Sequence, residues 1–278
     1  MTKQPALQVP NDVLTKKLLR KAVGGSVSLY SFLELLCMDD IYIMQDDFDE
    51  PVLHPRWTTD HLETGIGITD FTPIGGETGW VRGTPGGTDD AWIRMFGPGQ
   101  WSASRRCTVM GRFSGINSPT TKAEFGFLSA TSGLSDQGLG GGVLVKATPT
   151  ANSRTADFAL GVFDSDDNIS LDLIVKRGSS VGAGDQEGGP GLASLSAGEP
   201  FTVTLSITEG GGSRLWLNGA PIAKHQAAYG TVQSTEYPLA SPYGALSIWL
   251  FMQNRAATYE NDLAVDYIRA WQERVARP

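Results

Sequence analysis

Apolar residues occupy every second position in several segments of the chain, which is the pattern of β-strands with one buried face. The segments that show it are residues 105–113, 155–163, 168–177, 199–208, 244–253 and 262–272. Asn218-Gly219 separates two further short runs, RLWL and APIA, and this dipeptide is a strong signal for a type I′ hairpin. The pattern predicts about a dozen short strands in two antiparallel sheets packed face to face.

The first 38 residues follow a different pattern. Residues 11–23 place apolar residues at helical spacing, with a capping residue before them and Gly24-Gly25 after them. Residues 26–38 are a second apolar run, which periodicity allows as a buried helix or a strand, and we favour a helix. The composition changes at Asp39. We therefore predict a short helical N-terminal arm (residues 1–38) and an all-β sandwich (residues 39–278).

Charge is distributed unevenly between these two parts. The arm contains five Lys and Arg residues against Asp12 and Glu34, a net charge of +3, whereas the whole chain carries −8 and the remaining 240 residues therefore carry −11. The acidic body argues against nucleic acid as a partner, because phosphate binding needs a cationic face. The basic arm is typical of an attachment segment. Its candidate contact residues are Lys16, Lys17, Arg20, Lys21, Leu14 and Leu18.

The chain has no feature of a membrane or secreted protein. No window approaches the 18 or so continuous apolar residues of a membrane-spanning helix. The N-terminus is not a signal peptide, because Gly24-Gly25 and Glu34 interrupt its apolar stretch and no small-residue cleavage site follows. Two cysteines, Cys37 and Cys107, make no disulfide framework and are expected to be buried free thiols. We expect folding in a reducing cytoplasm.

Two stretches resemble the two ends of concanavalin A-like jelly rolls, the fold of legume lectins, laminin G domains and family 16 glucanases. Residues 46–57 (DDFDEPVLHPRW) resemble the opening strand, where Asp-Asp-Phe leads to an Arg-Trp or Lys-Trp pair. Residues 246–271 end in VDYIRAW, which resembles the closing strand. The resemblance implies a two-sheet antiparallel jelly-roll sandwich over about four fifths of the chain. It also implies that the first and last strands pair, with Phe48, Val265 and Tyr267 in one core.

The sequence lacks the catalytic motif of the glucanase branch. That branch carries a Glu-x-Asp-x-Glu strand, in which two carboxylates about 5–5.5 Å apart act as nucleophile and acid/base. Here Glu124 stands alone in AEFGFLSAT, and Glu260-Asn261-Asp262 lacks the third carboxylate. Residues 178–182 match a Gly-x-Ser-x-Gly nucleophile elbow only as a string, because a Gly-rich loop follows where a helix is needed. We therefore predict no catalytic residue, no cofactor and no enzymatic activity.

Three features are candidates for binding or assembly. Four tryptophans have faces that could stack on a sugar ring, with packing in the core as the alternative: Trp80, Trp92, Trp101 and Trp249. Asp164, Asp166 and Asn168 alternate as in a calcium loop and are a weak calcium candidate, because a turn between strands explains them as well. Residues 178–198 contain seven glycines and no periodicity, which is typical of a mobile or assembly loop.

Two functions remain at this point. A lectin-like sandwich without secretion signal or disulfides fits a virion structural protein of a tailed phage, such as a head decoration, head fibre or tail appendage. Such a protein would fold in the host cytoplasm, dock onto capsid or tail proteins by its arm, form a homo-oligomer and expose a sandwich that could bind surface glycans. The alternative is a carbohydrate-active enzyme or a carbohydrate-binding module of the glucanase-like sandwich type.

Overall fold

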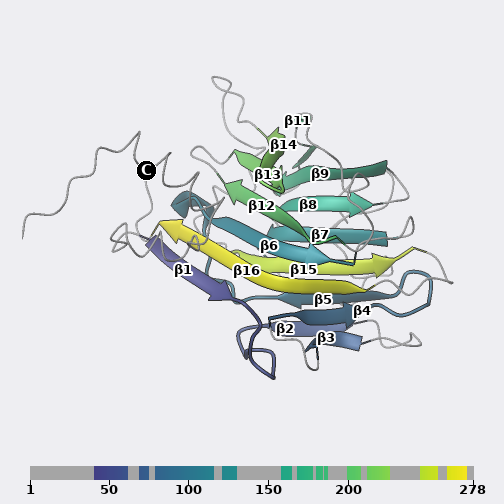
Figure 1. Ribbon diagram of the computed structural model, residues 1–278. Coiled ribbons are helices and arrows are strands. Elements are labelled where there is room, and N and C mark those ends of the chain that lie inside the picture. Colours follow the sequence, from purple (N-terminus) through teal and green to yellow (C-terminus); the bar gives the residue numbers. More distant parts are fainter. Residues whose placement is uncertain are drawn as a thin grey trace, which may run out of the picture. The chain divides into compact units, whose positions relative to one another are not determined.

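The computed structural model describes residues 41–61, 69–74, 79–115, 121–129, 158–164, 168–177, 180–183, 185–186, 199–207, 212–225, 245–255 and 262–273 (Figure 1). The chain divides into two compact units, Met1–Tyr42 and Ile43–Pro278. The predicted arm lies outside the described residues. Its helix and its six candidate contact residues therefore stay predictions.

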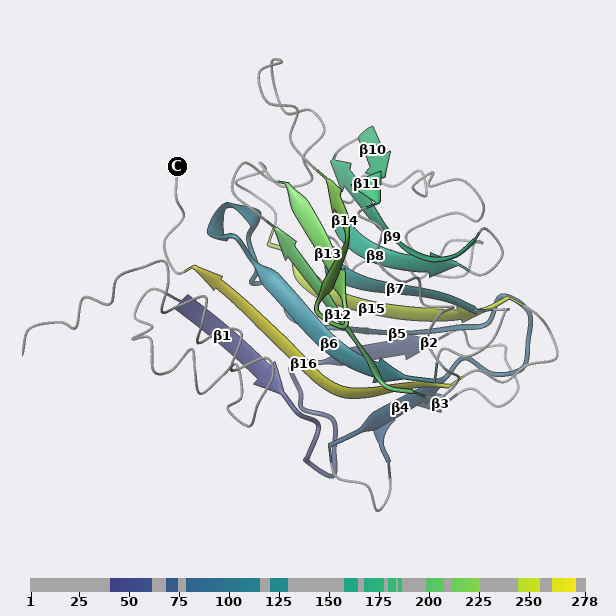
Figure 2. The same cartoon turned by 45° about the horizontal axis from the view of Figure 1, so that its top comes forward.

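The described strands form two antiparallel sheets that face each other as a sandwich, as the alternating pattern predicted (Figure 2). The nine-stranded sheet has the order β11 (Asp185–Gln186), β14 (Ala220–His225), β13 (Ser213–Leu217), β12 (Phe201–Ile207), β6 (Thr108–Ser114), β16 (Leu263–Glu273), β4 (Val81–Thr84) and β3 (Thr69–Pro73), with β1 (Ile41–Asp46) also paired to β16. The seven-stranded sheet has the order β10 (Ser180–Ala183), β9 (Asn168–Arg177), β8 (Phe158–Asp164), β7 (Thr121–Leu128), β15 (Ser247–Asn254), β5 (Trp92–Phe96) and β2 (Thr58–His61). One short 3₁₀ helix, Ala103–Arg105, precedes β6.

The all-β fold class is confirmed, and the strand positions follow the alternation. In β12 every second residue is buried, beginning at Phe201 and ending at Ile207. The pairing of β1 with the closing strand β16 also agrees with the resemblance to jelly rolls. Among the described residues, no helix has the length and apolar character needed to cross a membrane.

The predicted hairpin connects β13 and β14. Asn218 and Gly219 have φ angles of +50° and +79°, the left-handed values that both central residues of a type I′ turn adopt. The turn leaves Leu217 and Ala220 paired across the hairpin. The sequence therefore determines this part of the nine-stranded sheet locally.

The space between the sheets is filled by a core of aliphatic and aromatic side chains. Phe113 of β6 and Phe125 of β7 meet edge to face across it, with ring centroids 4.8 Å apart at 71°. Cys107 is a buried free thiol, as predicted, and burial raises its pKa far above the ordinary range, so the thiol stays protonated. Cys37 lies outside the described residues.

Two expectations about local structure need correction. The Gly-rich segment 178–198 was expected to lack regular structure, but it contains β10, paired to β9, and β11, paired to β14. These two short strands belong to different sheets. The segment therefore crosses from the seven-stranded to the nine-stranded sheet at one end of both.

The second correction concerns β16, which contains a β-bulge. The register with β6 shifts between Val265 and Tyr267, so the residues after the bulge change face. Val265 and Ile268 are fully buried, whereas Tyr267 and Arg269 are only half-buried. The expectation that Tyr267 shares the core with Phe48 is wrong; the Arg269 guanidinium instead lies 4.4 Å from the Tyr267 ring centroid.

Candidate functional site

The seven-stranded sheet carries a second apolar cluster that is separate from the core between the sheets. It consists of side chains that alternate with the core side chains along β5, β7, β8, β9 and β15, so they lie on the face turned away from the nine-stranded sheet, which we call the outer face. Its buried members are Trp92, Leu128, Phe158, Leu160, Val162, Ile174, Trp249 and Phe251, with Phe96 packed against them. Each of these eight buried side chains is at most 7% exposed, so the cluster is a second packed core on this face of the sheet.

Four aromatic rings lie side by side on β5 and β15 of this face. The Trp249 and Phe251 rings are nearly parallel, 6.2 Å apart at 7°, and the Phe96 ring lies 6.3 Å from Trp249. The Trp92 ring lies 6.3 Å from Phe251. We call these four side chains the ring cluster.

Glu124 lies next to the ring cluster and is completely buried. It faces outward from β7, the central strand of the sheet, and pairs in register with Phe251 on one side and Val162 on the other. Its Oε2 accepts a hydrogen bond of 2.9 Å from Trp249 Nε1. The carboxylate is thus held in a fixed position against an indole ring.

Lys122 neutralises this carboxylate. Its Nζ lies 2.8 Å from Glu124 Oε1, and both side chains are buried. The same ammonium lies 5.3 Å from the Phe251 ring centroid. On the outward side of β7, Glu124 therefore stands between Lys122 and Gly126, and no carboxylate occupies either neighbouring position.

Arg94 of β5 is the second buried cation of the outer face, with a side chain only 4% exposed. One guanidinium nitrogen, Nη2, donates to the carboxylate of Asp60 on β2. The guanidinium also lies over three rings, 4.9 Å from the centroid of Trp92, 5.8 Å from Trp249 and 5.9 Å from Phe96. Trp249 therefore connects the cation Arg94 with the carboxylate Glu124.

A second carboxylate lies in the same row of the sheet. Asp172 of β9 pairs in register with Val162, which in turn pairs with Glu124. Two strand spacings separate the Cα atoms of Glu124 and Asp172 by about 9.5 Å, and both side chains point outward. The Glu124 carboxylate bonds to Trp249 of β15, which lies on the side of β7 opposite to β8 and β9.

The structure separates the four tryptophans that the sequence suggested for glycan binding. Trp92 and Trp249 both belong to the ring cluster. Trp101 is fully buried in the core between the sheets, where it packs on Phe127. Trp80 is half-buried and lies 5.8 Å from the guanidinium of Arg112, a residue of the other sheet.

Sequence reasoning missed Lys122, Arg94 and Asp172. A signal was present for the first two, because each is a charge at an outward position inside an otherwise apolar strand, TKAEFGFL and WIRMF. A charge in such a strand must be buried with a partner. Asp172 gave no comparable signal, because a carboxylate on a half-exposed strand face is ordinary.

The calcium candidate is only partly described. Asp164 lies 2.8 Å from Nη2 of Arg255, an ion pair that occupies one side of its carboxylate. The backbone of Asn168 begins β9, and Asp166 lies outside the described residues. In the described part of the chain, no three His, Cys, Asp or Glu side chains come together as metal ligands would.

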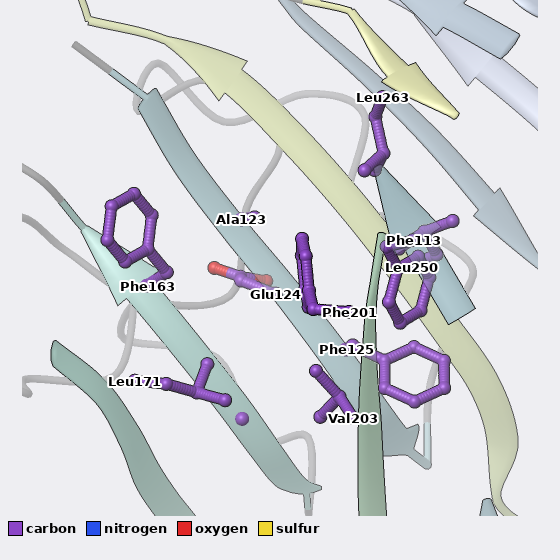
Figure 3. Close-up of a pocket in the computed structure, with 11 residues that line it drawn as sticks. Phe113, Ala123, Glu124, Phe125, Phe163, Leu171, Phe201, Val203, Leu250 and Leu263 are labelled. Atoms are coloured by element: carbon purple, nitrogen blue, oxygen red, sulfur yellow. The ribbon is translucent and has the colours of Figure 1, made fainter. Parts of the chain in front are cut away.

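A small cavity lies on the other side of β7, between the two sheets (Figure 3). It has a volume of about 20 Å³ and is lined by apolar atoms, so it is a dry packing void rather than a ligand site. Glu124 borders it, but its carboxylate bonds to Trp249 and Lys122. The lining residues are Phe113, Ala123, Glu124, Phe125, Gly161, Phe163, Leu171, Phe201, Val203, Leu250 and Leu263.

No family model and no curated protein matches the sequence. Solved structures share the fold. SCLam, a non-specific endo-β-1,3(4)-glucanase from family GH16, is similar with a TM-score of 0.54 and 12% identity, over 85% of this chain and 92% of that one. A pseudo-β-1,3-glucanase and immunostimulatory antigen of Mycobacterium tuberculosis gives 0.53 and 12%, over 82% and 98%. The carbohydrate recognition domain of Emp47p gives 0.51 and 12%, over 84% and 98%.

These similarities show that the chain has the sandwich fold of glucanase-like and lectin-like domains, in agreement with the concanavalin A-like resemblance. They contradict the prediction that the chain is not an enzyme, because the same sandwich carries endoglucanase activity in SCLam. The missing Glu-x-Asp-x-Glu motif was too narrow a ground for excluding catalysis. It excludes one pair of carboxylates on one strand, and the outer face brings other carboxylates together.

Proposed function

We propose that this protein is a carbohydrate-active sandwich that binds a polysaccharide, with a β-glucan as the first substrate class to test, on the outer face of its seven-stranded sheet. The observation that carries the proposal is the ring cluster around Glu124. Aromatic faces bind the apolar face of a sugar ring, and a fixed carboxylate accepts hydrogen bonds from sugar hydroxyls. The glucanase and lectin-like neighbours support a carbohydrate ligand by analogy of fold.

A second candidate function is hydrolysis of the bound polysaccharide. The row Glu124, Val162, Asp172 favours it, because it places two carboxylates on one face of the sheet on strands that are not adjacent, and inverting glycosidases are the class that uses the wider carboxylate separation. In that reaction one carboxylic acid protonates the leaving oxygen while the other carboxylate activates water on the opposite face of the sugar. We assign these two roles to Glu124 and Asp172.

The experiment is a panel of soluble polysaccharides, measured for binding by calorimetry and for hydrolysis by release of reducing ends. We expect the wild-type protein to bind at least one glycan, with a change in tryptophan fluorescence because Trp92 and Trp249 lie in the site. Both rings are buried in the structure, so the fluorescence also reports that the ligand reaches them. Trp249→Phe should weaken binding, since it removes the indole bond to Glu124.

Trp216→Phe is the matched control, because Trp216 is half-buried on β13 of the other sheet and should leave binding unchanged. If hydrolysis occurs, Glu124→Gln should slow it by at least about 100-fold, and the product should have the inverted anomeric configuration. Binding that Trp249→Phe and Trp216→Phe affect equally would place the site elsewhere. A protein that bound no polysaccharide of the panel would contradict the proposal.

The virion role rests on a lectin-like sandwich without a secretion signal or disulfides and on the basic arm, and none of the comparisons supports it. The described residues contain no part of the arm, so the role remains a hypothesis about residues 1–38. It is compatible with glycan binding by the sandwich. Recovery of the protein from purified phage particles would support it, independently of the polysaccharide experiment.

A further inference from the structure

In the part of the chain that the structure describes, two guanidinium nitrogens of Arg94 have no hydrogen-bond partner. Among the described residues, no acceptor is found for Nε or Nη1, although both atoms are buried and Asp60 occupies only Nη2. Contact with aromatic rings does not replace these hydrogen bonds, because the ring faces attract the charge as a whole. Buried donors without acceptors are rare in folded proteins, and each one needs an explanation, such as a bound water, an ion or a functional role.

On the neighbouring strand β15, Gln253 has a buried acceptor for which the described residues offer no donor. Its Nε2 donates to the side-chain Oδ1 of Asp90 at 3.1 Å and lies 3.4 Å from the Asp90 carbonyl oxygen. Both partners are acceptors, so the orientation of the amide is fixed. The amide oxygen Oε1 is left buried, and the described residues offer it no donor.

These donors and this acceptor are close to each other on the outer face. Arg94 of β5 pairs in register with Phe251 of β15. Gln253 is the next outward residue of β15 after Phe251. The Cα atoms of diagonal neighbours of this kind lie about 7–8 Å apart, so long side chains at the two positions can contact one ligand. Trp92, which pairs in register with Gln253, lies under the Arg94 guanidinium and supplies an aromatic face beside them.

The charges around the two residues disfavour an anionic ligand. Five carboxylates and four cations occupy outward positions of this sheet or its ends, a net charge of −1. The carboxylates are Asp60, Asp90, Glu124, Asp164 and Asp172, and the cations are Arg94, Lys122, Lys176 and Arg255. An uncharged hydroxyl suits both residues, because it accepts from Arg94 and donates to Gln253.

We infer that Arg94 and Gln253 form a specificity subsite that binds two hydroxyl groups of one uncharged sugar ring, next to Glu124. This inference rests on the proposed glycan binding and adds the residues that recognise the hydroxyl groups of the ligand. Arg94 donates to one hydroxyl oxygen, and Gln253 Oε1 accepts from a second hydroxyl. Replacing either hydroxyl by a methyl ether or a carboxymethyl ether therefore weakens binding.

The test uses laminarin, a soluble β-1,3-glucan, with its partly O-methylated and carboxymethylated derivatives, and measures Kd by calorimetry. The wild-type protein should bind laminarin more tightly than either derivative. Arg94→Lys keeps the positive charge beside Asp60 but removes Nε and Nη1, and it should raise the Kd for laminarin about tenfold or more. Gln253→Met should lose the preference for laminarin over its methylated form.

Arg112→Lys is the matched control. Arg112 lies on β6 of the other sheet, where it forms an ion pair with Asp266, so the same arginine-to-lysine change is made away from the subsite. This variant should keep the wild-type Kd and the preference for unmethylated laminarin. If Arg94→Lys does not fold, Gln253→Met still tests the inference, because the Arg94–Asp60 pair is intact in it.

Three results would overturn the inference. If laminarin binds and Gln253→Met discriminates like the wild type, the subsite is wrong while the proposed function stands. If carboxymethyl laminarin binds best and Arg94→Lys abolishes that preference, Arg94 is an anion site instead. If the wild-type protein does not bind laminarin, the inference fails, and the other polysaccharides of the panel decide separately on the proposed function.

Discussion

Lys122 and Glu124 place two charges inside the apolar outer face of the seven-stranded sheet. Moving both charges out of water has a large desolvation cost, which their contact of 2.8 Å offsets only while both partners are present. The pair is therefore weak evidence for stability. It is better explained as the means by which a carboxylate is kept in place beside Trp249.

The energetic consequence can be measured by removing one partner at a time. Lys122→Met should lower the free energy of unfolding by about 3–5 kcal/mol in urea, because it leaves Glu124 buried without its cation. The double variant Lys122→Met with Glu124→Gln should recover more than half of that loss. Glutamine is uncharged and still accepts the hydrogen bond of Trp249 Nε1.

A matched control lies on the surface of the same molecule. Arg82 and Asp262 form an exposed pair 3.9 Å apart, and Arg82→Met should cost at most about 1 kcal/mol. Equal losses for Lys122→Met and Arg82→Met would show that the buried pair does not hold a charged carboxylate.

At the scale of single elements, β16 shows how one bulge changes which side chains of a strand face the core. A strict period of two places Val265, Tyr267 and Arg269 on one face. The bulge instead returns Ile268 to the core and leaves Tyr267 outside. Asp266, at the bulge, forms an ion pair with Arg112 of β6.

Substitutions along β16 should follow the bulged register. Ile268→Ala should lower the free energy of unfolding by about 2–5 kcal/mol, because it opens a cavity in a packed core. Tyr267→Ala should cost clearly less, since its ring is half-buried, and Asp266→Ala should cost at most about 1 kcal/mol. A larger loss for Tyr267→Ala than for Ile268→Ala in urea unfolding would restore the unbulged register.

The same comparison shows what the sequence could predict. Alternation in 199–208 and the Asn218-Gly219 turn were sufficient for β12 and the β13–β14 hairpin, because both are determined by local chemistry. The bulge of β16 was not predictable, since it depends on pairing with β6, a strand about 150 residues earlier in the chain.

The candidate site was predictable only in part. Trp92, Trp249 and the isolated Glu124 could be named from residue type. Their meeting on one face depends on the strand order β7, β15, β5, which neighbouring residues in the sequence do not encode. Arg94 and Lys122 could have been added by asking why apolar strands contain a charge.

At the scale of the whole molecule, the sandwich and the arm are expected to be separate folding units. Ile43–Pro278 forms a compact unit of its own, with a core between its two sheets. A variant lacking residues 1–38 should therefore keep the β-rich circular dichroism spectrum and a single cooperative urea transition. A broad or non-cooperative transition in that variant would show that the arm completes the core.

The position of β16 has a consequence for how the protein is made. This strand is the last one described in the chain, yet it lies between β6 and β4 in the middle of the nine-stranded sheet. During synthesis, the edges of β6 and β4 that β16 will cover stay open until the ribosome has released residues 263–273. Open strand edges invite pairing with other chains. We therefore expect nascent chains of this protein to be most prone to aggregation before β16 has been synthesised.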